Sequence, residues 1–191
     1  MIGFLLIALL LAALAVGSDS ELVAKLRTGD QSAFKRIFDR YHVQLHRYLI
    51  RRGVQDTAAE DIVQNAFIAI WEKRETLDPS QSVKGYLYRV CHNRAANHFR
   101  DRSKFVDMGD APEFGLMPTQ ETDLSFKELK SAVDRAVREL PDRRRAVFEL
   151  CFINGLTYRE TAVTLEISQK TVENQMLHAL RTIRERVQHL L

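Results

Sequence analysis

The chain has 191 residues, which is room for one ordinary domain or two small ones. Hydrophobic residues make up 46% and charged residues 28%, a balance that excludes wholesale disorder. The two cysteines, Cys91 and Cys151, are too few for a disulfide framework, and no C-x-x-C pair indicates a zinc ribbon or a thioredoxin motif.

The net charge of +3 is unevenly distributed along the chain. Residues 1–104 carry 16 Lys and Arg against 11 Asp and Glu, and residues 125–191 carry 12 against 9. The segment between them, 105–124, carries five acidic residues and no Lys or Arg. Two basic blocks joined by an acidic connector indicate two domains that face a polyanion, with a linker that avoids it.

An unbroken apolar run, IGFLLIALLLAALAV, fills residues 2–16 of the leader 1–18. It is shorter than the roughly 20 residues that span a membrane, and it lacks the basic start of a secretory signal. Three interpretations remain open: a weak signal or anchor, a helix that packs on the domain, or translated upstream sequence with the working start near Val16. We favour the last, because everything after Ser18 is typical of a cytoplasmic, DNA-facing protein. Membrane contact is expected only through the leader.

From about Asp19 onward the hydrophobic periodicity is helical, and no strand-type alternation occurs, so the predicted fold class is all-α. The expected boundaries are Asp30 and Gly53 for one helix, Asp56 or Thr57 and Leu77-Asp78-Pro79 for the next, and Ser82 for the start of a third. The expected apolar stripes are Phe34, Ile37, Phe38, Tyr41, Leu45, Tyr48 and Leu49; then Ala59, Ile62, Val63, Ala66, Phe67, Ile70 and Trp71; then Tyr86, Leu87, Val90 and Phe99.

A linker follows these helices, because residues 104–124 contain two prolines and two glycines and lack a helical stripe. The predicted domains are therefore 19–104 and 125–191, with an acidic linker at 105–124. Helices resume after it, one ending before Pro141 and one ending at Asn154-Gly155. Their expected apolar residues are Leu129, Val133, Ala136, Val137 and Leu140, and then Ala146, Val147, Leu150 and Cys151.

The strongest local pattern is a predicted helix-turn-helix near the C-terminus. Thr157 and Glu160 have the spacing of a capping box at the start of a short helix. Glu166-Ile167 is expected to form the turn, and Ser168 is expected to cap a second helix. The expected inward stripe of that helix is Val172, Met176, Ala179, Leu180, Ile183 and Val187.

The opposite face of this second helix is polar and suits the major groove of DNA. The N-terminal part of such a helix enters the groove, where amide, basic and acidic side chains pair with base edges. The predicted DNA-binding residues are Arg159, Gln169, Lys170, Thr171, Glu173, Asn174 and His178. Arg159 and Thr171 suit phosphates. The alternative is a plain helical pair with a solvated polar face.

Two separated segments resemble the bacterial sigma-70 family, in its small extracytoplasmic-function (ECF) group. DQSAFKRIFDRYHVQLHRYL, AEDIVQNAFIAIWEKRETL and KGYLYRVCHNRAANHFRDR resemble its domain 2. ELPDRRRAVFELCFINGLTYRETAVTLEISQKTVENQMLHALRTIRERV resembles its domain 4. The resemblance implies a cytoplasmic sigma factor that binds core RNA polymerase and directs promoter recognition and transcription initiation. The apolar leader is not part of the family pattern.

The resemblance also implies roles for particular residues. Asp61, Gln64, Phe67 and Trp71 match the helix that grips the clamp of the polymerase's largest subunit, although Phe67 and Trp71 are equally explained as core. Tyr86, Arg89, His92, Asn93, Asn97 and Arg100 match the stretch that meets the promoter −10 element, where aromatics with Arg and Asn suit single-stranded DNA. Tyr86 is equally explained as a core aromatic. The helix-turn-helix residues named above then read the −35 element.

Further partners implied are the flap region of polymerase and an anti-sigma factor, and the acidic linker matches the family's connector. The alternative function is a stand-alone helix-turn-helix regulator that needs no core polymerase. No cofactor, no metal and no enzymatic activity are expected, because no nucleophile–base pair, phosphate loop or metal-ligand spacing is found. Cys91 and His92 with His98 fit no usual structural zinc site.

Overall fold

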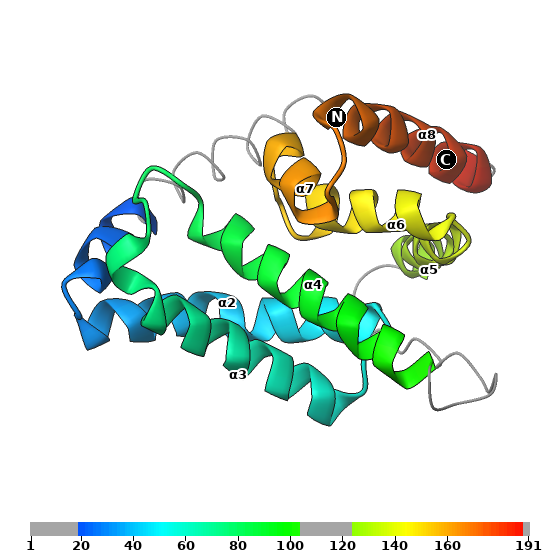
Figure 1. The fold of residues 1–191 in the computed structure, drawn as a ribbon. Coiled ribbons are helices and arrows are strands. Elements are labelled where there is room, and N and C mark those ends of the chain that lie inside the picture. Colours follow the sequence, from blue (N-terminus) through cyan, green and yellow to red (C-terminus); the bar gives the residue numbers. More distant parts are fainter. Residues whose placement is uncertain (1–18, 104–123, 189–191) are drawn as a thin grey trace. The chain divides into compact units, whose positions relative to one another are not determined.

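The computed structural model describes residues 19–103 and 124–188. Within these ranges the chain is helical and has no strand, which confirms the predicted all-α class. The chain divides into two compact units, the first unit (19–103) and the second unit (124–188) (Figure 1). The predicted leader 1–18 and residues 105–123 of the predicted linker lie outside the described residues, and Leu124 already belongs to a helix.

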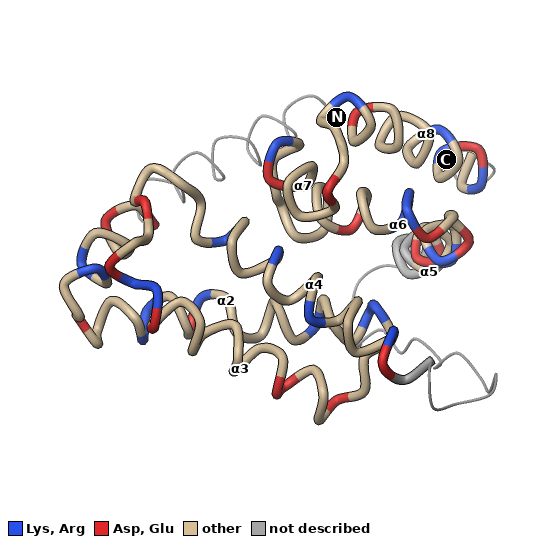
Figure 2. Tube along the Cα trace, in the orientation of Figure 1, with Lys and Arg blue, Asp and Glu red and all other residues tan. Residues whose placement is uncertain are grey.

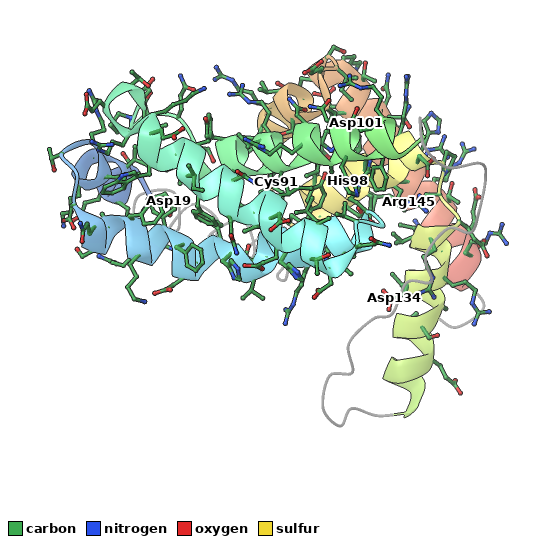
Figure 3. All side chains as sticks on the ribbon, turned by 60° about the horizontal axis from the view of Figure 1, so that its bottom comes forward. Asp19, Cys91, His98, Asp101, Asp134 and Arg145 are labelled. Atoms are coloured by element: carbon green, nitrogen blue, oxygen red, sulfur yellow. The ribbon has the colours of Figure 1, made fainter. Side chains whose placement is uncertain are left out.

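The first unit is built on three mutually packed helices: α2 (Gln31–Arg51), α3 (Asp56–Glu72) and α4 (Val83–Ser103) (Figure 1). A helix over residues 19–27 precedes them, and a short 3₁₀ turn (Arg74–Thr76) follows α3. Asp19 ties the first helix to α2, because its carboxylate accepts hydrogen bonds from Arg40 and Tyr41 (Figure 3).

The ends of these helices follow the local sequence. Asp30 caps α2, accepting from the backbone N–H groups of Ser32 and Ala33 at 2.7 and 3.1 Å. Gly53 ends it with φ of 85°, a left-handed conformation that favours glycine. Ser82 caps α4 by accepting from the N–H of Gly85 at 3.0 Å. Helix α3 begins at Asp56 itself, with Gln55 in the cap position.

The second unit packs α5 (Leu124–Arg138), α6 (Asp142–Phe148) and α7 (Tyr158–Leu165) against the long helix α8 (Gln169–Val187). A π-helical turn, Glu149–Ile153, follows α6, with the N–H of Asn154 bonded to the carbonyl of Glu149 at 2.8 Å. The core of this unit is Ala136, Val137, Leu140, Val147, Phe148, Ala162, Val172, Met176, Ala179 and Ile183.

The predicted apolar stripes are wrong at two positions. Leu180 was expected inside, yet its side chain is 47% exposed, and the inward positions around it are filled by Met176, Ala179 and Ile183. Phe99 is 37% exposed on α4, whose interior side is instead made by Val83, Leu87, Tyr88, Cys91 and Ala95. Tyr88 and Cys91 face inward because α4 meets both α2 and α3, so its buried face is broader than one stripe.

Candidate functional site

The second unit contains the predicted helix-turn-helix. The Thr157 hydroxyl accepts from the N–H of Glu160 at 3.2 Å, and the Glu160 carboxylate accepts from the N–H of Thr157 at 2.6 Å, which completes the capping box. Glu166 makes the turn with φ of 55°, and Ile167 packs against the core beside it. Ser168 then caps α8 through the N–H of Thr171 at 3.0 Å. The two caps define where α7 and α8 begin, and therefore which residues form the first turns of α8.

The residues predicted for the −35 element lie on the outer face of this motif. Arg159, Gln169, Lys170, Asn174 and His178 are exposed, and Thr171 and Glu173 are half-buried. The Lys170 ammonium lies 3.5 Å from the Glu173 carboxylate, so the two form a surface ion pair in the free chain. A DNA contact by either residue would replace that pair, which is weak because both side chains are solvated.

Tyr158 adjoins this face, and the sequence did not single it out. Burial raises the pKa of its hydroxyl, with smaller contributions from Cys151 and Glu173. The neighbouring Cys151 thiol lies 3.2 Å from the Thr161 hydroxyl. An exposed tyrosine at the first position of α7 has no periodicity that distinguishes it from a surface residue, so only the fold shows that it adjoins Glu173.

The residues predicted for the −10 element lie on α4, where Asn93, Asn97 and Arg100 are exposed and Tyr86, Arg89 and His92 are half-buried. The Arg89 guanidinium stacks over the Tyr86 ring at 5.5 Å from its centroid, an arrangement that suits both a phosphate and a base. Asn93, Asn97 and Arg100 are exposed, and they follow Arg89 at helical spacing. These side chains therefore share one face of α4.

His92 is placed differently from the other five. Its Nδ1 lies 2.8 Å from the Tyr48 hydroxyl on α2, and Tyr48 is buried against Tyr88 with ring centroids 5.3 Å apart. Burial, and to a lesser extent the charge of Arg52, lower the pKa of His92 to about 4. In the free chain this histidine joins α2 to α4.

The residues predicted to bind polymerase lie on α3, which carries four acidic residues and no Lys or Arg (Figure 2). Asp61 and Gln64 are exposed. Phe67 is 2% exposed and packs its ring against Phe34 and Phe38 at 6.1 and 4.8 Å. Trp71 is half-buried, with Phe34 at 5.3 Å and the Arg74 guanidinium 4.8 Å over its ring. Core packing therefore accounts for Phe67, and the exposed part of the surface is Asp61 and Gln64.

Among the residues that the structure describes, no three His, Cys, Asp or Glu side chains are grouped closely enough to hold a metal ion. Within the same ranges, no helix is both long and apolar enough to cross a membrane.

Family models match both units of the chain in order. The model described as sigma-70 region 2 matches residues 37–105, and the model described as sigma-70 region 4 matches residues 130–183. Curated relatives match over nearly the whole length. The ECF RNA polymerase sigma-E factor of Escherichia coli strain K12 is 28% identical over 185 residues, covering 91% of this chain and 96% of that protein. The ECF RNA polymerase sigma factor RpoE of Cereibacter sphaeroides is 26% identical, covering 82% and 87%.

Solved structures share the fold. CnrH, solved in complex with the cytosolic domain of CnrY, has a TM-score of 0.61 and 24% identity, covering 90% of this chain and 97% of that one. The sigma factor RpoE of Bartonella quintana, solved in complex with the anti-sigma factor NepR, has a TM-score of 0.63 and 19% identity, covering 81% and 96%.

Two helical units, the second with a capped helix-turn-helix, define a DNA-recognising regulator of transcription. The chain belongs to the sigma-70 family, in its ECF group, and is a sigma factor that directs promoter recognition with core RNA polymerase.

Proposed function

We propose that the two units divide the work of promoter recognition. The first unit, within 19–104, binds the clamp of the polymerase's largest subunit through α3 and meets the −10 element through α4. The second unit, within 125–191, reads the −35 element through α8 and contacts the flap region. The residues before Leu124, from 105 onward, connect them. The observation that carries this assignment is the capped helix-turn-helix, whose second helix presents a polar first turn.

The −35 surface is proposed as Arg159, Gln169, Lys170, Thr171, Glu173, Asn174 and His178. The capped N-terminus of α8 leaves backbone N–H groups that favour a phosphate, and the side chains of the next turn reach base edges. Asn174 is exposed on that turn, so it is the strongest candidate for a bidentate contact to adenine.

The −10 surface is proposed as Tyr86, Arg89, Asn93, Asn97 and Arg100. His92 supports this surface from inside, because its ring is bonded to Tyr48. An aromatic ring beneath a guanidinium offers a stacking platform next to a phosphate contact, which suits single-stranded DNA.

Three further proposals rest on the family membership. The chain works in the cytoplasm, where core polymerase and promoters are found. It performs no chemistry itself, since phosphodiester formation belongs to core polymerase. An anti-sigma factor controls it, a proposal motivated by the related factors that were solved bound to such partners or to a cytosolic domain.

Dependence on core polymerase tests the proposed function against a stand-alone regulator. Promoter binding is measured with the chain alone and with core polymerase added. We expect weak binding alone and tight binding with core. Equal affinity in both conditions would indicate a regulator that needs no polymerase.

The polymerase surface is tested by combining Asp61→Arg with Gln64→Ala. Both side chains are exposed on α3, so the variant is expected to keep its helical content while its affinity for core falls. A matched control is Glu72→Ala, an exposed acidic residue at the far end of the same helix. If the double variant copurifies with core as well as the unmodified chain does, the α3 assignment is wrong.

A further inference from the structure

Two histidines on α2 face two carboxylates on α3 in matching register. The Nε2 atoms of His42 and His46 each lie 3.2 Å from a carboxylate oxygen, of Glu60 and Asp56 respectively. The histidines are one turn apart on α2, and the acids are one turn apart on α3. These two contacts join α2 to α3 on the side of α3 that carries Asp56 and Glu60.

Only one of these pairs extends to the proposed polymerase surface. The Oε1 atom of Glu60, which faces His42, also accepts a hydrogen bond from the Gln64 side-chain nitrogen at 3.2 Å. Asp56 has no such bond to Gln64. His42, Glu60 and Gln64 therefore form a chain of contacts from α2 to the exposed amide.

The His42 ring is itself held in place. It stacks on Phe38 with ring centroids 4.6 Å apart and an interplanar angle of 27°. Phe38 in turn packs against the buried Phe67 at 4.8 Å. The core of the first unit thus fixes the imidazole, and the imidazole fixes one oxygen of Glu60. The pKa of Glu60 is lowered first by the His42 bond and then by the Gln64 bond, so the carboxylate stays charged and accepts from both.

We infer that His42 is a positioning residue for binding of core polymerase, acting through Glu60 on the Gln64 amide. This inference rests on the proposed role of Gln64. The Gln64 nitrogen is engaged by Glu60, so the amide oxygen is left to accept from a donor on the partner. Without His42, Glu60 loses one of its two bonds, and the Gln64 amide loses its fixed orientation before binding.

The test measures affinity for core polymerase in the full chain. His42→Leu removes the bond and keeps an apolar side chain beside Phe38. His42→Gln places an amide nitrogen near the position of Nε2 and is the rescuing variant. His46→Leu is the matched control, because it breaks the equivalent pair one turn away and leaves the His42–Glu60–Gln64 contacts in place; the charge of His46 has only the smallest of the effects on Glu60. Thermal unfolding of each variant is followed in parallel.

We expect Gln64→Ala to weaken core binding about threefold to tenfold, the size of one hydrogen bond. His42→Leu should weaken it by a few fold, His42→Gln should restore it, and His46→Leu should leave it unchanged. In the Gln64→Ala background, His42→Leu should have no further effect, a result that a merely structural role for His42 does not give.

Two outcomes overturn the inference, and they are distinguishable. If Gln64→Ala weakens binding but His42→Leu behaves like His46→Leu, or still adds its loss when residue 64 is Ala, then His42 has no positioning role and the α3 surface stands. If Gln64→Ala leaves binding unchanged, the assignment of Gln64 to the polymerase surface fails, and the role of His42 fails with it.

Discussion

At the scale of single residues, a substitution on the helix-turn-helix that removes a base contact should have a different effect from one that removes a phosphate contact. Asn174→Ala removes a candidate base contact worth about 1–3 kcal/mol of discrimination. It should lower activity at the cognate promoter and flatten the preference among −35 variants. Arg159→Ala should weaken binding to all sequences alike and reduce the slope of log affinity against log salt by about 0.9.

Holoenzyme binding to a panel of −35 variants at several salt concentrations checks both effects. Val163→Ala is a suitable control, since it removes an exposed apolar side chain from α7 and no charge. Should Asn174→Ala leave the order of the variants intact while Arg159→Ala rearranges it, the placement of α8 in the groove is incorrect.

His92 makes the stability of the first unit depend on pH. Its pKa of about 4 in the folded chain lies below the ordinary value of 6.5, so the unfolded chain binds the proton more tightly. Its contribution to stability is complete above pH 6.5 and is lost as the pH falls toward 4. The expected loss across this window is on the order of 1–3 kcal/mol.

The chain's single tryptophan, Trp71, belongs to the first unit, so its fluorescence reports on urea unfolding there. His92→Asn keeps a polar group near Nδ1 for the Tyr48 hydroxyl and does not titrate in this range. Its unfolding free energy should change less than that of the unmodified chain between pH 7 and pH 4.5. Identical pH dependence in the two proteins would show that another group is responsible.

The sequence predicted that most of the proposed site residues are exposed, and it did not predict their neighbours. Polar residues at helical spacing predict an exposed face, which is where Asp61, Gln64 and Asn174 lie. The same reasoning cannot find the His42–Glu60 contact or the inward turn of His92, because these depend on how two helices pack and not on the period of either one.

At the scale of secondary structure, the turn of the helix-turn-helix holds a residue in an unfavourable conformation. Glu166 has φ of 55°, and a left-handed conformation costs a non-glycine residue roughly 1–2 kcal/mol. Glu166→Gly should relieve this cost, partly offset by the greater freedom of glycine in the unfolded chain. The expected net gain is about 0.5–1 kcal/mol of unfolding free energy.

Circular dichroism during thermal unfolding measures this gain. Glu166→Ala is the control, because it removes the charge and retains the Cβ atom that makes the conformation unfavourable. A glycine variant no more stable than the alanine variant would mean that backbone strain at this turn is negligible.

The helix boundaries were largely predictable because they depend on local chemistry. Four helices begin at a predicted residue whose side chain accepts a hydrogen bond from a backbone N–H group of the first turn: Asp30, Ser82, Thr157 and Ser168. The buried apolar faces of α4 and α8 were less predictable. Leu180 is exposed because α5, α6 and α7 together cover only part of the α8 surface. The sequence of α8 alone does not show which part is covered.

At the scale of the whole molecule, the first unit should fold without the leader. The helix over residues 19–27 contributes Leu22, Val23 and Leu26 to the core, and Asp19 is bonded to Arg40 and Tyr41. A chain that starts at Gly17 keeps all of these contacts. It should therefore be soluble, helical and active in core-dependent transcription.

The matched truncation starts at Gly29 and loses that helix. Two buried leucines go with it, and deleting one buried leucine costs about 2–5 kcal/mol, so this shorter chain should unfold at much lower urea. Recovery of the native protein tightly bound in the membrane fraction, with loss of regulation on truncation at Gly17, would show that the leader is not a misassigned start.

The π-helical turn after α6 determines which apolar side chains reach the surface of the second unit. This turn ends the helix, and its hydrogen bonds span five residues where those of an α-helix span four, as in the bond from the N–H of Asn154 to the carbonyl of Glu149. Its five residues therefore take positions around the helix axis that differ from those an α-helical continuation of α6 would give them. Cys151 accordingly meets Thr161, while Phe152, which is 66% exposed, and Ile153 emerge at the surface. Deleting one residue from this turn would change which apolar side chains are exposed on that surface, although the composition of the chain would stay almost the same.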